Sequence, residues 1–291
     1  MKRIRFIVNP FSGVSKKSNL EQLVNQELDT NKFNFEICYT NAPNHATELC
    51  VSALKADFDI IGVVGGDGTV NEVAKAMLHQ TKALVVLPGG SGNGFAMHLG
   101  MGRDMQKAIR MINTAKEHVI DTAYANGEFF INVAGIGFDG KICNVIQNET
   151  KRGMQVYFKS MFKEGHKFPF LNAQIEVDGK MIKGDFISIT AANASMFGYN
   201  FTIAPDAELT DGLLDLVLIK KVKRYKYYLN AWRFLNKSIL STSFVQTFKG
   251  KEIKISTDKS TDYQIDGEGK GTIRNLEISI NPASVRILKP S

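Results

Sequence analysis

The sequence is poor in cysteine and lacks the histidine pairs that bind zinc. Only three cysteines occur in 291 residues, at wide spacings: Cys38, Cys50 and Cys143. Their number is odd and no Cys-x-x-Cys pair is present, which argues against a disulfide framework and a zinc ribbon. None of the five histidines belongs to a His-Glu-x-x-His motif, the pattern of zinc-dependent proteases. We therefore expect reduced thiols and a cytoplasmic location.

Long apolar runs are also missing. No run approaches the roughly 18–20 residues that a membrane-spanning helix needs. The basic start at Met1–Ile4 looks like that of a signal peptide, but Asn9-Pro10 ends the apolar stretch after Val8. This stretch is too short for the apolar region of a signal peptide, which has about 7–15 residues. We expect a protein that neither follows this export route nor crosses a bilayer.

What the sequence does contain is a globular composition with a local excess of positive charge. Hydrophobic residues make up 44% and charged residues 22%, which excludes a disordered chain. The length corresponds to about two domains. The net charge is +7, and the segment 220–237 carries several lysines and arginines but no acid. Such a patch suits phosphate groups, nucleic acid or an anionic membrane surface.

Apolar strands alternate with helical patterns in the first part of the chain. Strands are predicted at 3–8, 33–39, 60–64 and 83–87, and helices at 19–28, 45–55, 69–78 and 105–113. Repeated βα units with apolar strands predict a parallel sheet that is covered on both faces. We place this α/β domain at residues 1–125.

From about residue 121 the pattern changes to one of hairpins. Turn pairs occur at Asn126-Gly127, Asp178-Gly179, Asp211-Gly212 and Asp266-Gly267, and such pairs between strand-like runs are hairpin signals. The predicted strands are 129–134, 174–177, 182–190, 214–219, 253–256 and 276–280. Helical patterns near 151–165 and 222–240 interrupt them. We predict a second, mostly antiparallel β domain at 126–283.

Three glycine-rich loops follow strands of the first domain, at 9–13, 65–69 and 89–94. The carboxyl ends of parallel strands open on one edge of a sheet, so we expect these loops to converge. Glycines let backbone N–H groups approach an anion, and the following helix adds its positive end. Neither a Walker A nor a Gly-x-Gly-x-x-Gly motif is present. The loops therefore form either another kind of nucleotide site or simply a set of turns.

Asp67 is unusual inside such a loop. A carboxylate repels phosphate unless a cation lies between them, which points to Mg²⁺, an ion that prefers oxygen ligands. The alternative is that Asp67 only caps the helix that follows it.

The segment Gly65-Gly66-Asp67-Gly68-Thr69-Val70-Asn71-Glu72 resembles the catalytic signature of the diacylglycerol kinase-like lipid kinases, a superfamily that includes sphingosine kinases. Its Gly-Gly-Asp-Gly core is shared with NAD kinases. The other similar segments follow in the family's order: Asn9-Pro10-x-Ser12-Gly13, Thr40, Pro88-x-Gly90-Ser91-x-Asn93, Asp121 with 132–138, Leu209-x-Asp211-Gly212, and Asp266-Gly267-Glu268. The resemblance covers nearly the whole chain. It implies an NAD-kinase-like (phosphofructokinase-like) α/β domain followed by an antiparallel β-sandwich, with the active site between them.

The resemblance also implies roles for individual positions. ATP would be held by Asn9, Pro10, Phe11, Ser12, Gly13, Thr40, Gly66, Asp67, Gly68, Thr69, Val70, Asn71, Glu72 and Ser91. Asp67 would work with the catalytic Mg²⁺, and Glu268 would be the general base. A further Mg²⁺ site would use the Asp211 side chain with the backbone carbonyls of Glu208 and Leu213. A final strand near 284–291 can return to the first domain.

Two positions depart from the bacterial Gly-Thr-x-Asn-Asp form of the third loop. Ser91 keeps the hydroxyl of the threonine, whereas Gly94 removes a carboxylate, and the Ser-Gly-Asn form looks more like that of sphingosine kinases. We expect Asp121 to contact the substrate, because it lies where the two predicted domains join.

Two segments keep alternative interpretations. Asp266-Gly267-Glu268 is either a plain hairpin turn or the catalytic motif. The helical segments near 151–165 and 222–240, the first with Lys151, Lys159 and Lys163, either pack an apolar face on the core or lie against anionic lipid.

We predict an ATP- and Mg²⁺-dependent lipid kinase that phosphorylates a hydroxyl of diacylglycerol or of a related lipid such as a sphingoid base. Its expected partner is lipid at a membrane surface, with peripheral membrane association. Nucleic acid is not expected, because no recognition module is visible, and a homodimer is left open. The alternatives are an NAD kinase and a non-catalytic lipid- or nucleotide-binding regulator.

Overall fold

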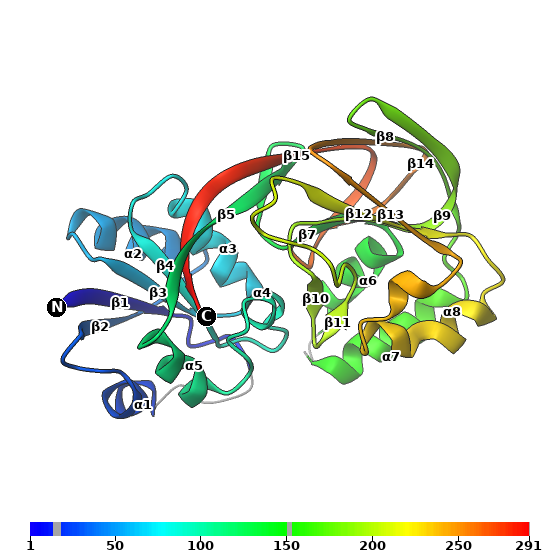
Figure 1. Ribbon diagram of the computed structural model, residues 1–291. Helices are drawn as coiled ribbons and strands as arrows, with labels where there is room; N and C mark the ends of the chain where they lie inside the picture. The colour runs from blue at the N-terminus through cyan, green and yellow to red at the C-terminus, as the bar shows by residue number, and fades with distance from the viewer. Residues whose placement is uncertain (14–18, 150–152, 291) are drawn as a thin grey trace. The chain divides into compact units, whose positions relative to one another are not determined.

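The computed structural model describes residues 1–13, 19–149 and 153–290. The chain forms two compact units, shown in Figure 1. The first contains Met1–Ile120 and Ala283–Ser291, and the second contains Asp121–Pro282. The predicted domain limits, 1–125 and 126–283, stay a prediction. The fold class, an α/β part followed by an antiparallel β part, is confirmed.

A parallel sheet forms the centre of the first unit. Its strands are β1 (Lys2–Val8), β2 (Phe33–Tyr39), β3 (Ile60–Gly65), β4 (Ala83–Pro88) and the end of β15 (Glu268–Lys289). The order across the sheet is β2-β1-β3-β4-β15. The last strand joins in parallel through the pairing of Ile287 with Leu84. Every residue of β3 and β4 is buried, which accounts for their uninterrupted apolar sequences.

Helices cover both faces of this sheet. They are α1 (Leu20–Glu27), α2 (His45–Lys55), α3 (Asp67–Ala76), α4 (Gly94–His98) and α5 (Met105–Ile112). Figure 1 shows α2 and α3 packed together on one face, and α1 and α5 on the other. The chain moves from β1 outward to β2 and then returns past β1 to β3, so right-handed crossovers place α1 and α2 on opposite faces. The reversal leaves a switch point between β1 and β3, where open α/β sheets bind ligands.

The second unit is built from antiparallel strands. They are β5 (Lys116–Ala125), β6 (Glu128–Phe130), β7 (Val133–Gly137), β8 (Leu171–Val177), β9 (Lys180–Ala192), β12 (Leu214–Lys220), β13 (Val245–Gly250), β14 (Glu252–Ile265) and β15, with a separate hairpin of β10 (Met196–Gly198) and β11 (Phe201–Thr202). The main order is β13-β12-β9-β7-β14-β15. The long strands β9 and β14 each pair with β8 along their first part and with β7 along their last part. Each long strand thereby contributes to two layers.

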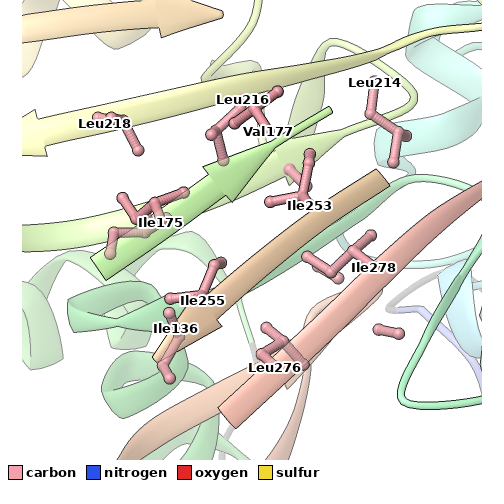
Figure 2. Close-up of a cluster of buried hydrophobic side chains, with 14 of the residues drawn as sticks. Ile136, Ile175, Val177, Leu214, Leu216, Leu218, Ile253, Ile255, Leu276 and Ile278 are labelled. Atoms are coloured by element: carbon pink, nitrogen blue, oxygen red, sulfur yellow. The ribbon is translucent and has the colours of Figure 1, made fainter. Parts of the chain in front are cut away.

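The core of the second unit lies between these layers (Figure 2). Ile175 of β8, Leu216 of β12, Ile253 of β14 and Leu276 of β15 are among its fully buried members. Along β8 the buried residues alternate with exposed ones. This alternation is the period-two pattern of a strand with one face on the core.

The second unit also carries helices: α6 (Phe138–Gln147), α7 (Met154–Gly165), α8 (Tyr225–Asn230), and the short 3₁₀ helices η2 (Ala231–Phe234) and η3 (Ile239–Ser241). The sequence patterns did not predict β5, β13, the β10–β11 hairpin or α6. They predicted one helix over 222–240, which the structure divides into three. No residue of α8 or η2 is fully buried, and their contacts with the core come from the partly buried Tyr227 and Phe234. Lys151, expected on the first helical segment, lies outside the described residues.

The single strand predicted at 129–134 is also wrong, because the structure has β6 and β7 in its place. The backbone N–H groups of Ile131, Asn132 and Val133 all donate to the carboxylate of Asp266. These bonds take the amides out of the ladder and separate the two strands. No helix in the described parts of the chain is long and apolar enough to span a membrane.

Candidate active site

The three glycine-rich loops of the first unit meet at the carboxyl edge of its sheet. Asn9 Nδ2 donates to Thr69 Oγ1 at 3.0 Å, which joins the loops after β1 and β3 across the switch point. Ser12 Oγ donates to the carbonyl oxygen of Gly89 at 3.0 Å, which joins the loops after β1 and β4. The convergence expected from the order of the strands is therefore present.

Close backbone approach explains the glycines in these loops. A Cβ atom on Gly90 would lie 2.4 Å from the Cα of Gly66, and one on Gly13 would lie 2.7 Å from the carbonyl oxygen of Gly89. Gly13 also has a φ of +76°, a backbone angle that residues other than glycine adopt at a cost in free energy. Larger residues would push the loops apart. The result is a concentration of bare backbone beside the N-terminus of α3, an arrangement that suits phosphate.

Asp67 begins α3, but its carboxylate does not cap that helix. The N-cap residue is Gly66, and no side chain bonds there. Instead, Asp67 accepts the backbone N–H groups of Gly94 at 3.3 Å and Phe95 at 3.2 Å, at the start of α4. The simple capping alternative is therefore wrong. The carboxylate connects two of the loops, and Gly94 contributes to it through its backbone.

The surroundings of Asp67 suit a hard cation. Burial raises the pKa of its carboxyl group, although the N–H groups of Phe95 and Gly94 act in the opposite direction. No lysine or arginine among the described residues forms an ion pair with this carboxylate. Mg²⁺ would supply the missing positive charge, and carboxylate oxygen is a ligand that it prefers. The residues present therefore fit the metal that the sequence predicts.

The other predicted nucleotide residues lie around the same edge in different environments. Thr40 is buried at the end of β2, and its N–H donates to Val8 O at 2.9 Å. Phe11 is exposed, whereas Val70 is buried in the core, so only the backbone of Val70 could face a ligand. Glu72 accepts the N–H of Asn44 at 3.3 Å through Oε1. The remaining members are on the loops or in the first turns of α3: Pro10, Gly68, Asn71 and Ser91.

The predicted second metal set is in the second unit. Asp211 Oδ2 lies 2.7 Å from Lys249 Nζ, which also lies 3.3 Å from Asp215 Oδ2. Lys249 thus supplies one positive charge to these two carboxylates. In the parts of the chain that the structure describes, no group of three or more His, Cys, Asp and Glu residues could hold a metal ion. Metal binding by Asp211 with the carbonyls of Glu208 and Leu213 stays a prediction.

Asp121 holds this same loop in place. Its Oδ2 accepts the N–H of Gly212 at 2.7 Å, and its own N–H donates to Leu209 O at 2.7 Å. The side chain is buried. These contacts give Asp121 a structural role, and its predicted contact with substrate stays a prediction.

The motif Asp266-Gly267-Glu268 forms a hairpin turn that hydrogen bonds hold in place. Asp266 is buried and accepts three backbone N–H groups, at 2.8–3.1 Å. Gln264 Oε1 accepts the N–H of Gly267 at 2.9 Å. Glu268 follows at the start of β15, where its exposed carboxylate lies 3.3 Å from Lys270 Nζ. The turn therefore presents Glu268 on a rigid support. The sequence identified the motif but not the anchoring role of Asp266.

The second unit contains a buried acid, Asp139, that no sequence pattern pointed to. Asp139 accepts hydrogen bonds from Ser188 Oγ at 2.7 Å, Thr190 Oγ1 at 3.1 Å and Gln264 Nε2 at 3.3 Å. Burial raises the pKa of its carboxyl group. The sequence feature that could have identified Asp139 is its position as an acid in the mainly apolar segment between β7 and the middle of α6.

The two segments with alternative interpretations differ in exposure. In α8 and η2 one apolar set faces outward, with Leu229 67% and Trp232 54% exposed, whereas Tyr227 and Phe234 pack against the core. We call the exposed set Tyr225, Tyr228, Leu229, Trp232 and Leu235 the apolar cap. Exposed Lys223, Lys226 and Lys237 belong to the same segment and form no ion pair with any described residue. In α7, by contrast, Tyr157 and Met161 are partly buried and line a cavity.

Comparisons with known proteins agree with this geometry. The model of the diacylglycerol kinase catalytic domain matches residues 3–125, and that of the YegS C-terminal NAD kinase beta sandwich-like domain matches residues 132–289. A diacylglycerol kinase of Bacillus subtilis (strain 168) is 29% identical over 279 residues, covering 94% of this chain and 92% of that protein. A diacylglycerol kinase of Staphylococcus carnosus (strain TM300) is 26% identical over 278 residues, covering 94% and 90%.

Two solved structures from Bacillus anthracis str. Sterne share the fold. One has a TM-score of 0.81 at 23% identity and covers 99% of this chain and 95% of that one. The other, a diacylglycerol kinase, has a TM-score of 0.71 at 21% identity and covers 99% and 97%. The two family models together match most of the sequence, and the second alone matches more than half of it. The chain therefore belongs to the diacylglycerol kinase-like lipid kinases.

Proposed function

We propose that this lipid kinase transfers the γ-phosphate of ATP, with Mg²⁺, to a hydroxyl of diacylglycerol or of a related lipid such as a sphingoid base. The observation that carries the proposal is the convergence of three glycine-rich loops around the half-buried carboxylate of Asp67. The names of the relatives favour diacylglycerol as the substrate. An NAD kinase is the alternative that the shared Gly-Gly-Asp-Gly segment leaves to be tested.

The residues of the first unit bind and orient the nucleotide. Backbone N–H groups of the loops and the N-terminus of α3 face the phosphates. Asp67 would hold Mg²⁺, and the bound ion would offset the negative charge of the phosphate groups during transfer. Because the electrostatics are supplied by backbone and metal, the site needs few charged side chains of its own.

The second unit supplies the group that acts on the lipid hydroxyl. Glu268 accepts the proton of the attacking hydroxyl as general base. Its support on the Asp266 turn limits the movement of the carboxylate. Lys270 Nζ lies 3.3 Å from the Glu268 carboxylate and can orient it.

The substrate is reached at a membrane surface. A lipid with two acyl chains remains in the bilayer, so the enzyme must bind there. The apolar cap with Lys223, Lys226 and Lys237 combines apolar side chains and positive charge in the way that interfacial helices do. We assign this surface to peripheral association with anionic lipid.

Labelled ATP offered with a panel of lipids tests the proposed function. We expect Mg²⁺-dependent labelling of diacylglycerol or a sphingoid base and none of NAD. Labelling of NAD alone would replace the proposal with an NAD kinase. ATP binding without transfer to any acceptor would support a regulator instead.

A further inference from the structure

The hairpin of β14 and β15 has an interrupted ladder close to its turn. Asp262 pairs with Thr272, and Gln264 pairs with Gly269. One residue of β14 therefore opposes two of β15 between these pairs, which is the pattern of a β-bulge. Because a bulge disrupts the ladder and turns the strand locally, the ladder alone fixes the segment 264–271 less firmly than the rest of the hairpin. We call this segment, which carries the proposed general base, the hairpin tip.

Asn144 of α6 takes the place of the missing ladder at the bulge. Its Nδ2 donates to the carbonyl oxygen of Gly271 at 3.0 Å, and its Oδ1 accepts the N–H of Gly271 at 3.0 Å. One side-chain amide thereby pairs with both backbone groups of Gly271, as a neighbouring strand would do. The same Nδ2 donates to Asp262 Oδ1 of β14 at 2.7 Å. The side chain of Asn144 therefore connects both strands of the hairpin to α6.

The hairpin and α6 also approach each other closely through two glycines. A Cβ atom on Gly269 would overlap Asn144 Oδ1, and one on Gly140 of α6 would lie 2.5 Å from the Cα of Tyr263. A larger residue at either position would push the hairpin away from the helix. The glycines thereby bring the two elements close enough for the hydrogen bonds of Asn144 to form.

A second set of contacts fixes the turn itself. Gln264 is fully buried, and its Oε1 accepts the N–H of Gly267 at 2.9 Å. Its Nε2 donates to Asp139 Oδ2 at 3.3 Å, so the carboxylate sets which end of the amide faces the turn. Asp139 accepts further hydrogen bonds from Ser188 and Thr190 of β9. The turn before the proposed base is therefore connected to the first turn of α6 and to the sheet.

We propose that Asn144 and Gln264 are positioning residues for Glu268, and that they act by fixing the hairpin tip on α6. A general base must lie within hydrogen-bond reach of the proton that it accepts, so the direction in which the tip presents the carboxylate matters for the reaction. A displacement of about 1 Å at a reacting group can lower the rate about 100-fold. The inference rests on the proposed function in that Glu268 acts as the base.

Hydrogen exchange of the free protein tests the fixing of the hairpin tip without any substrate. Asn144→Ala removes the side-chain bonds to Asp262 and Gly271, and it should raise the exchange rates of the N–H groups of residues 267–269 about tenfold. Asn148 is an exposed asparagine directly after α6, so Asn148→Ala is the matched control and should leave these rates unchanged. Equal rates in Asn144→Ala and the wild type would overturn the proposal.

Steady-state kinetics with labelled ATP and dioctanoylglycerol test the effect on catalysis. Asn144→Ala and Gln264→Met should each lower kcat about 10- to 100-fold at an unchanged KM for ATP, because the nucleotide is bound by the first unit. Asn148→Ala should keep the wild-type kcat. If Gln264→Met does not fold, Asn144→Ala decides, since its bonds lie at partly exposed positions where water can replace them. A normal kcat in Asn144→Ala would contradict the positioning role.

A double-variant cycle distinguishes positioning of Glu268 from a general loss of structure. If Asn144 acts through Glu268, Asn144→Ala should lower kcat by less than about twofold in the Glu268→Gln protein. The full loss in that background would reject the positioning role.

The same measurements separate this inference from the proposed function. A low kcat in Glu268→Gln with a normal kcat in Asn144→Ala keeps the general base and rejects its positioning. A normal kcat in Glu268→Gln with faster exchange in Asn144→Ala rejects the base, although α6 fixes the tip. If the wild type phosphorylates no lipid, the kinase proposal fails, and the exchange rates alone decide whether α6 fixes the tip.

Discussion

At the residue scale, Asp67 carries the most direct test of the first unit. Asp67→Asn keeps the size of the side chain and an oxygen that accepts the N–H of Gly94 or Phe95, but it removes the charge that is proposed to hold Mg²⁺. Metal stabilisation of the transferred phosphoryl group contributes several kcal/mol, so kcat should fall by about 10³-fold or more. Steady-state kinetics of Asp67→Asn measure the change. Asp57→Asn, at an exposed site of the same unit, is the control, and normal kcat in both variants would remove Asp67 from catalysis.

Glu268 tests the role of the second unit. If it is the general base, Glu268→Gln should lower kcat by about 10²–10⁴-fold while ATP affinity stays the same. Glu252 is an exposed glutamate on β14 of the same unit, so Glu252→Gln serves as the matched control. A weaker ATP affinity at unchanged kcat would assign Glu268 to binding instead.

Asp139 predicts a pH dependence of stability. Burial raises the pKa of its carboxyl group in the folded state, so the folded protein keeps this proton after the unfolded chain has lost it. The associated stability is fully present below the unfolded pKa and is lost as pH rises through the folded pKa, by up to about 1.4 kcal/mol per pH unit. Asp139→Asn is neutral and avoids this loss.

The measurement is urea unfolding of both proteins at a series of pH values. The free energy of unfolding of Asp139→Asn relative to wild type should increase as pH rises above the range of an ordinary aspartate. A difference that is constant with pH would show that Asp139 does not titrate abnormally.

At the element scale, the two long hairpins have turns of the same sequence type but different burial. Asp178 has a φ of 46° and Asp266 a φ of 49°, and each of them precedes a glycine. Asp178 is exposed and accepts the N–H groups of Lys251 and Glu252, whereas Asp266 is buried with three N–H donors. Loss of the Asp266 carboxylate leaves buried N–H groups without an acceptor. At the exposed Asp178 turn, water can take the place of the lost carboxylate.

Asp266→Ala should therefore reduce the free energy of unfolding by about 3 kcal/mol or more, and Asp178→Ala by about 1 kcal/mol. Asp266→Asn retains one acceptor oxygen and a residue that tolerates positive φ, so its loss should be intermediate. Chemical denaturation of the three variants gives the order. Equal losses at the two turns would show that burial of Asp266 contributes nothing.

At the scale of the whole molecule, the net charge of +7 is less informative than its distribution. The lysines of 220–237 accompany the apolar cap on one short segment. Each lysine near an anionic bilayer contributes about 1 kcal/mol, screened over about 8–10 Å at moderate salt. Binding to vesicles should therefore increase with their content of anionic lipid and weaken as salt is added.

Lys226→Glu exchanges a positive for a negative charge, a change of about 2 kcal/mol, and should weaken vesicle binding by roughly 30-fold. Lys259→Glu, at an exposed position of β14, makes the same change outside the segment and should have little effect. Sedimentation with vesicles measures both. If the affinity for vesicles changes neither with salt nor in either variant, the apolar cap does not bind anionic lipid.

Local sequence alone determined much of the first unit. Strands 60–64 and 83–87 are apolar throughout because both faces of a parallel sheet are covered, and that pattern is readable without neighbours. The glycine-rich loops could also be recognised from local sequence, because they directly follow these strands. Asp67 was singled out as a carboxylate inside a glycine-rich loop, and the family resemblance then supplied its catalytic role and that of Glu268, which no periodicity could identify.

Tertiary structure decided the features that depend on groups distant in sequence. Asp266 divides the strand predicted at 129–134, and it does so through hydrogen bonds across more than a hundred residues of chain. Lys249 forms ion pairs with both Asp211 and Asp215, although nothing near 211–215 predicts its presence. The apolar stripe of 222–240 was correctly identified, but a helical period specifies which residues share a face and not what that face contacts. Whether such a face is buried or exposed depends on packing between elements, and the same packing creates the cavity beneath α7 and α8.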